Sequence, residues 1–317
     1  MRAMRWVLWL CIGIPLVGKA DPQILRMAVP FPTGSKGMTD LQQAARVLLK
    51  QTEGRVQIKW VEQLDLESEG RAVDGVLWVG SPLALRSPTA AVDSLLLFYR
   101  NAEEPARFLE KMKPQMVAEL EAQDFVPLAF LDLGFAYLFS VRPLETVETF
   151  QASRLWVPSE DPRAWELSEA YGVLRVLLEA PQVRAALQDG RVETVVAPPL
   201  GAILMQWHVN IRCGSDRPFL HLLGVLVVRR EALAKLEAVD QDRVRAELDV
   251  ACRAVADDLR QKESEALDVM VQGGAKRVPF GVTPEQKTEW EAWSAQVAER
   301  LAGAGVVSSA ALGWARE

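Results

Sequence analysis

The sequence is poor in the residues that most enzymes use for catalysis. Its 317 residues include only two histidines, His208 and His221, and three cysteines. It contains no HExxH metalloprotease pattern, no Walker phosphate-binding loop, no GxSxG nucleophile motif and no pair of CxxC motifs. A metal site needs three or four ligands, and no set of candidates with suitable spacing is found. We therefore expect a protein that is not an enzyme, with no catalytic residue, no metal and no cofactor.

Clustered positive charge and long apolar runs are also missing. Lysine and arginine total 36 against 42 acidic residues, and the net charge is −6. Without a basic stripe, nucleic acid is not an expected partner. No apolar run reaches the roughly 20 residues that a membrane-spanning helix needs, and the apolar segment 219–228 predicts a buried strand. We expect a chain that is not embedded in a membrane.

The first 20 residues have the layout of an export signal. Arg2 and Arg5 precede an apolar stretch, and the segment VGKA (17–20) ends in the small residue Ala20, the expected −1 position of a cleavage site. The pattern predicts a signal peptide over residues 1–20 and a periplasmic location. Cys213 and Cys252 remain after cleavage. An oxidising compartment allows a disulfide between them, but two separate buried thiols are favoured, because sequence does not show that they meet.

Short apolar, β-rich runs alternate with helical segments along the rest of the chain, which predicts α/β structure with parallel strands. The strands predicted in this way include 75–79, 95–99 and 155–158. The chain is expected to cross to a second α/β unit near residue 133, between strands 126–131 and 135–141, and to return near residue 228. Residues 21–132 plus 229–317 would form lobe I, and residues 133–228 lobe II. A long helix over 240–271 would span both. Ligands of such sheets bind at the carboxyl ends of the strands, which would face each other across a cleft.

Aromatic and apolar residues stand near the ends of the predicted strands and are candidates for lining that cleft. Taken singly, each is also compatible with core packing, and His221 with a hydrogen-bonded core position. The candidate ligand-binding residues are Phe31, Trp78, Phe135, Tyr137, Trp156, Ala197, Pro198, Trp207 and His221.

Five segments in order over about 200 residues resemble the solute-binding proteins of tripartite ATP-independent periplasmic (TRAP) transporters. They are LRMAVPFPTGS (25–35), TEGRVQI (52–58), LQDGRVE (187–193), DRPFLHLLG (216–224) and AKLEAVDQ (234–241). The resemblance implies a two-lobed, type II-like periplasmic solute-binding fold. It also implies capture of a small molecule by hinge closure, with membrane subunits of a TRAP-type transporter as partners.

The chain departs from the family pattern at the residue that usually binds the ligand's carboxylate. The resemblance places an arginine at the third position of segment 154–158, which reads RLWVP, so Trp156 stands there. Indole cannot make the bidentate pair that guanidinium makes with a carboxylate, and Arg154 lies further from the strand end. Segments 156–162 (WVPSEDP) and 199–208 (PLGAILMQWH) resemble an atypical branch that lacks this arginine. A second polar anchor is replaced by valine and alanine in segment 192–198.

These departures lead us to expect a largely apolar organic solute or a hydrophobic carboxylate. Only 14 residues separate Trp60 from Gly75, where the family has a longer loop and a helix, and residues 65–72 can form two helical turns at most. This shortening supports an alternative function, in which the protein is a sensory or partner-binding protein on the same scaffold and has no transport role. A periplasmic enzyme is the least supported alternative.

Overall fold

The computed structural model of the chain describes residues 21–62, 67–68 and 71–314. The predicted signal peptide, residues 1–20, lies outside the described residues. Within them, no helix combines the length and the apolar character needed to cross a bilayer.

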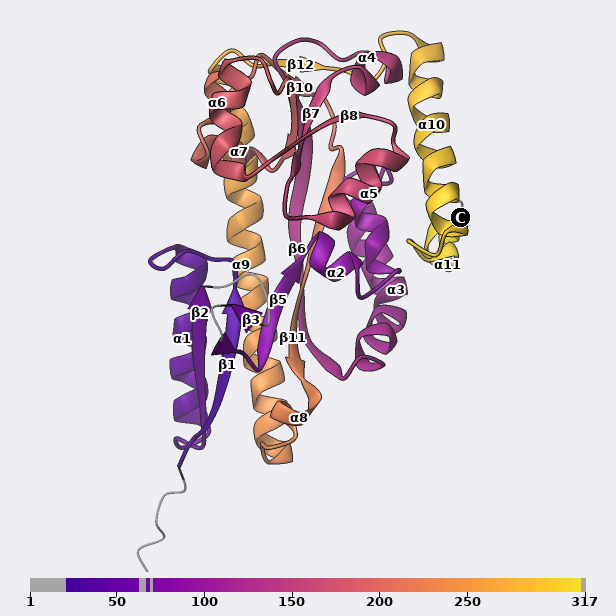
Figure 1. Ribbon diagram of the computed structural model, residues 1–317. Helices are drawn as coiled ribbons and strands as arrows, with labels where there is room; N and C mark the ends of the chain where they lie inside the picture. The colour runs from indigo at the N-terminus through magenta and orange to yellow at the C-terminus, as the bar shows by residue number, and fades with distance from the viewer. Residues whose placement is uncertain (1–20, 63–66, 69–70, 315–317) are drawn as a thin grey trace, which may run out of the picture.

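Eight strands form the main path of a mixed sheet, in the order β2-β1-β5-β11-β6-β9-β7-β8 (Figure 1). Their bounds are β1 Gln23–Val29, β2 Val56–Glu62, β5 Gly75–Val79, β6 Phe125–Ser140, β7 Arg154–Pro158, β8 Leu174–Leu178, β9 Thr194–Ala197 and β11 Leu220–Arg229. Two short strands, β10 Cys213–Ser215 and β12 Lys276–Val278, extend the sheet beside β6. The expectation of parallel strands holds only in part. Strand β11 runs antiparallel to β5 and β6, and β6 runs antiparallel to β9.

Three long elements run through both halves of the molecule. The strands β6 and β11 pair from one half to the other, and helix α9, Ala238–Gln272, packs along β6, α1 and α7. The expected two-lobed α/β fold with a long helix spanning both lobes is therefore confirmed. We call the half that holds β1, β2 and β5 lobe I, and the half that holds β7, β8, β9, β10 and β12 lobe II.

The prediction of two strands around Asp132-Leu133-Gly134 is wrong, because β6 is one strand of 16 residues. Gly134 has φ +86°, a value that glycine tolerates, and the register with β11 shifts between His221 and Leu223. The chain therefore passes between lobes within a continuous, locally irregular strand. The predicted crossings at residues 133 and 228 lie within β6 and near the end of β11.

The apolar run 95–99, predicted to be a strand, is also not one. It follows the 3-10 helix η1, Ala90–Ser94, and Leu97 adopts φ +57°, which breaks an extended conformation. Residues 65–72 were expected to form two helical turns at most. Within this segment, two short antiparallel strands pair instead: β3, Glu67–Ser68, and β4, Arg71–Ala72.

The remaining helices cover the sheet. They are α1 Lys36–Gln51, α2 Ser81–Ala84, α3 Glu104–Glu121, α4 Val147–Gln151, α5 Pro162–Ala170, η2 Ala180–Gln182, α6 Val183–Gln188, α7 Pro199–Leu204, η3 Trp207–Val209, α8 Arg230–Leu233, α10 Pro284–Gly303 and α11 Ser309–Trp314. Cys213 and Cys252 are free and buried, which confirms the expectation of two separate thiols.

Candidate ligand-binding cavity

A cavity of about 550 Å³ lies between the lobes and receives residues from both. Lobe I contributes residues 79–82, at the end of β5 and the start of α2, with Ser94 and Leu96. Lobe II contributes residues 155–158 of β7, one face of α5, and residues 196–198 at the end of β9. The shared strands supply Ala136 and residues 220–222. The volume is in the range of about 300–1,000 Å³ that is usual for small-molecule sites.

The cavity forms where three strands end and three helices begin. Gly80, at φ +62°, turns the chain from β5 into α2. Asp161 accepts a hydrogen bond from the Ala164 N–H at 3.0 Å and so caps α5 just after β7. Pro198 links β9 to α7 in an extended conformation. These are the carboxyl ends of strands, where ligands of α/β sheets bind.

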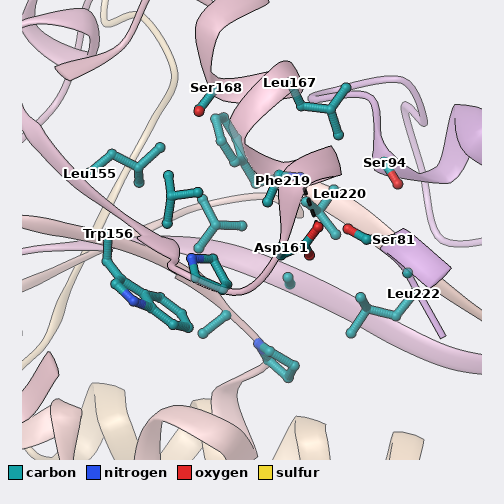
Figure 2. A pocket seen from close by; sticks show the side chains of 18 of the residues that line it. Ser81, Ser94, Leu155, Trp156, Asp161, Leu167, Ser168, Phe219, Leu220 and Leu222 are labelled. Atoms are coloured by element: carbon teal, nitrogen blue, oxygen red, sulfur yellow. Dashed lines mark hydrogen bonds between the residues drawn. The ribbon is translucent and has the colours of Figure 1, made fainter. Parts of the chain in front are cut away.

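Five of the predicted ligand-binding residues line this cavity: Trp156, Ala197, Pro198, Trp207 and His221. The rings of Trp156 and Trp207 meet edge to face at 4.9 Å. The Trp156 indole N–H donates to the Leu178 carbonyl at 2.9 Å, which fixes the ring. Figure 2 shows the Trp156 side chain as part of the wall.

The other four predicted residues do not line it. Trp78 is only 2% exposed and packs against Phe125, with the Arg86 guanidinium 4.2 Å from its ring centre. Phe31 packs on the core of lobe I. Phe135 lies edge to face with His221, and Tyr137 lies beneath the Arg277 guanidinium.

Several lining residues were not predicted. Leu155, Phe219, Leu220 and Leu222 supply apolar wall, while Ser81, Ser94 and Asp161 supply polar atoms (Figure 2). The signal that could have found Ser81 and Asp161 is their place just after the predicted strands 75–79 and 155–158.

Most of the described wall is apolar, and its basic side chain is that of His221. Among the described residues that line the cavity, none is lysine or arginine. Arg154, considered as a substitute for the family's arginine, points elsewhere: it donates to the Gly190 carbonyl at 2.7 Å and pairs with Glu193 at 3.1 Å. No cluster of metal-ligating side chains occurs in the part of the chain that the structure describes.

His221 combines the two positions considered for it, since it lines the cavity and is hydrogen-bonded in the core. Its Nδ1 lies 2.7 Å from Asp93 Oδ1 and its Nε2 lies 2.9 Å from Asp132 Oδ1. The hydroxyl of Tyr99 also donates to Asp93, and Arg260 pairs with Asp132 at 2.9 Å.

The two carboxylates determine the charge of His221. Burial alone would lower its pKa, but the charge of Asp93 and the hydrogen bonds to Asp132 and Asp93 raise the pKa to about 9. Burial would raise the pKa of Asp132, but the hydrogen bond and charge of His221 lower it to about 2. His221 is therefore an imidazolium with both N–H groups already used.

A cavity at strand ends, between two lobes that share long strands and a long helix, defines a cleft-type solute-binding protein. The chain belongs to the bacterial extracellular solute-binding protein family 7, whose sequence profile matches residues 28–303. This match confirms the resemblance to the TRAP solute-binding proteins. The members of the family are binding proteins and not enzymes.

Solved structures of TRAP periplasmic solute-binding proteins share the fold. One from Roseobacter denitrificans with bound β-D-glucuronate has 16% identity and a TM-score of 0.77, over 92% of this chain and 98% of its own. One from Ralstonia eutropha with bound (S)-2-acetolactate has 16% identity and a TM-score of 0.76, over 92% and 97%. A Bordetella pertussis receptor that binds pyroglutamic acid has 16% identity and a TM-score of 0.75, over 93% and 99%. Among curated proteins, none matches the sequence of this chain.

Proposed function

We propose that the protein is the periplasmic solute-binding subunit of a TRAP-type transporter, exported by a signal peptide cleaved after residue 20, and that it captures a largely apolar organic solute. The ligand class is inferred from the cavity wall: leucine, valine, proline, tryptophan and phenylalanine dominate it, and none of the described lining residues is lysine or arginine. Removing apolar surface from water contributes roughly 25 cal/mol per Å², which makes such a wall sufficient for affinity.

The solutes bound by the structural neighbours are acids, and the cavity of this chain differs from what an acid requires. Carboxylates are bound most strongly by a two-pronged guanidinium contact. At the position that the resemblance assigns to this contact, the chain has Trp156, whose side-chain N–H donates to the Leu178 carbonyl. His221 has no N–H to offer either, because Asp93 and Asp132 hold both ring nitrogens.

Capture is proposed to occur by closure of the two lobes around the solute. The lobes meet beside the cavity, where the Leu96 N–H of lobe I donates to the Tyr171 hydroxyl of lobe II at 2.9 Å. Helices α2 and α5 also touch. A solute that contacts both walls favours the state in which these contacts form.

Calorimetric titration of the purified protein tests this proposal. A panel of hydrophobic organic compounds is compared with glucuronate and with small dicarboxylates. We expect hydrophobic members to bind, and Trp156→Ala to weaken that binding about tenfold or more, since truncating a large buried side chain removes several kcal/mol of contact.

Trp60→Ala is the matched control, because Trp60 is a partly buried tryptophan whose N–H donates to Leu41 and which does not line the cavity. It should leave affinity unchanged. Tight binding of dicarboxylates or sugar acids, with no binding of hydrophobic compounds, would overturn the ligand class.

A further inference from the structure

Three polar side chains on the cavity wall keep unused hydrogen-bonding capacity. Ser81 of α2 and Ser94 of η1 make no side-chain hydrogen bond to any described residue. Asp161 uses Oδ1 to cap α5, while its Oδ2 has neither a hydrogen bond nor an ion pair within the described part of the chain.

The other polar groups of the wall are already occupied or enclosed. Ser168 donates to the Trp165 carbonyl at 2.8 Å, and the Tyr171 hydroxyl accepts from Leu96. The indole N–H of Trp207 has no partner among the described residues, but this atom is fully buried and is not presented to the cavity.

Asp161 differs from the charged groups around His221, which are engaged in ion pairs. The His221 imidazolium and the Arg260 guanidinium face two carboxylates, Asp93 and Asp132. Among the described residues, Asp161 forms no ion pair, and the nearby Arg163 pairs with Glu166 instead. Enclosing an unpaired carboxylate under a bound solute is unfavourable unless the solute supplies a compensating donor or charge.

The three groups also come from opposite lobes. Ser81 and Ser94 belong to lobe I and Asp161 to lobe II. Figure 2 shows Trp156 and Leu155 at one side of the cavity, Ser81 and Ser94 at the other, and Asp161 between them. A head group beside Asp161 therefore contacts both lobes, while an apolar body extends toward Trp156.

We infer that the solute is an amphipathic molecule with a hydrogen-bond-donating head, a protonated amine, which Asp161 binds with the hydroxyls of Ser81 and Ser94. This inference rests on the proposed function and narrows its ligand class. It predicts that an amine is preferred over an alcohol of the same body, and an alcohol over a carboxylate.

The test is a matched ligand series measured by calorimetry at neutral pH: 2-phenylethylamine, 2-phenylethanol and 3-phenylpropanoate, with the wild-type protein and Asp161→Asn. Asparagine keeps an oxygen that caps α5 but removes the charge. A hydrogen bond to a charged group corresponds to about 10- to 100-fold in affinity, so we expect Asp161→Asn to weaken amine binding at least about tenfold. Alcohol binding should change only a few-fold.

Glu160→Gln is the control. Glu160 precedes Asp161 in the sequence and carries the same charge, but its side chain does not line the cavity. It should leave all three affinities unchanged, and thermal unfolding checks that both variants fold. Preferential binding of 3-phenylpropanoate, or an amine-to-alcohol ratio that Asp161→Asn leaves unaltered, would overturn this inference while the apolar-ligand proposal stands. If no member binds, although other hydrophobic compounds do, the inference fails alone; if no hydrophobic compound binds, both fail.

Discussion

At the scale of single residues, the most consequential group is His221, which holds together segments that are distant in sequence. It joins Asp93 in lobe I to Asp132 within β6, at the point where the register with β11 shifts. Its side chain is 3% exposed, so its charge interacts with the two carboxylates with little screening by solvent. The network stabilises the irregular part of the two shared strands.

This network predicts how stability depends on pH. Because the folded pKa of His221, about 9, exceeds its ordinary value of 6.5, its contribution is fully present below pH 6.5 and is lost as pH rises through 9. Asp132 contributes above its ordinary value of 3.8, and loses that contribution as pH falls through about 2. We expect the free energy of unfolding of the wild-type protein to fall by about 3 kcal/mol between pH 6.5 and 9.

Urea denaturation across that range, on wild type and His221→Gln, measures the effect. The variant should be less stable at pH 6.5 and should show a shallower decline toward pH 9. Parallel pH profiles in the two proteins would contradict this account of the network.

Strand register explains which of the predicted ligand-binding residues line the cavity and which do not. Trp156, Ala197 and Pro198 line the cavity because β7 and β9 end at it. Trp78 precedes Val79 in β5, and successive side chains of a strand point to opposite faces, so Val79 faces the cavity and Trp78 the core. Phe135 and Tyr137 flank Ala136 in the same way. Composition indicated the right strands, but in β5 and β6 an error of one residue exchanges wall for core.

At the scale of elements, the long helix α9 is joined to α7, on the lobe II side of the cavity, through the half-buried carboxylate of Glu263. Glu263 of α9 accepts a hydrogen bond from the Leu200 N–H of α7 at 2.8 Å. Gly201 and Met205, in and just after α7, line the cavity. Burial raises the pKa of Glu263 to about 7, although the bond from Leu200 acts in the opposite direction.

Glu263→Gln is therefore predicted to stabilise the protein at pH 8. A carboxyl whose folded pKa is raised contributes stability below its ordinary value of 4.5 and loses it as pH rises through about 7. Glutamine keeps an acceptor for Leu200 and carries no charge. After allowing for solvent screening of a partly buried group, we expect a gain of about 1–2 kcal/mol at pH 8 and none at pH 4.5.

Thermal unfolding at the two pH values checks this. Glu265→Gln, an exposed position on the same helix, should change stability by less than about 0.5 kcal/mol. An equal gain for Glu263→Gln at both pH values would show that ionisation of Glu263 is not its cause.

Elements whose sequence pattern is long and regular could be predicted from the sequence. Elements whose pattern is interrupted by turn-forming residues could not. The helix expected over 240–271 matches α9 because helix-favouring residues continue without glycine or proline over its length. The continuity of β6 was missed because Asp132-Leu133-Gly134 is typical of a turn, whereas pairing with β11 keeps this segment extended. The apolar run 95–99 resembled a strand, but tertiary contacts, including the Leu97 N–H to the Phe219 carbonyl, determine its conformation.

At the scale of the whole molecule, the two lobes are joined by more than the shared strands and α9. The C-terminal helix α10 contacts both: the Trp290 indole N–H donates to the Glu145 carbonyl at 2.9 Å, and the Ser294 hydroxyl donates to the Leu96 carbonyl. Beyond α10, the Ser308 N–H donates to the Pro88 carbonyl of lobe I at 2.8 Å. The resemblance to the family predicted the two-lobed arrangement, while these contacts depend on packing that sequence pattern alone does not reveal.

We propose that this family member holds a largely apolar solute in a cavity whose described lining residues include no arginine. Mass spectrometry of the compound that co-purifies with the protein from its native periplasm tests it most directly. We expect a predominantly hydrophobic organic molecule, retained by the wild type and by Trp60→Ala but lost from Trp156→Ala. Recovery of a sugar acid or a small dicarboxylate, retained equally by all three proteins, would contradict it.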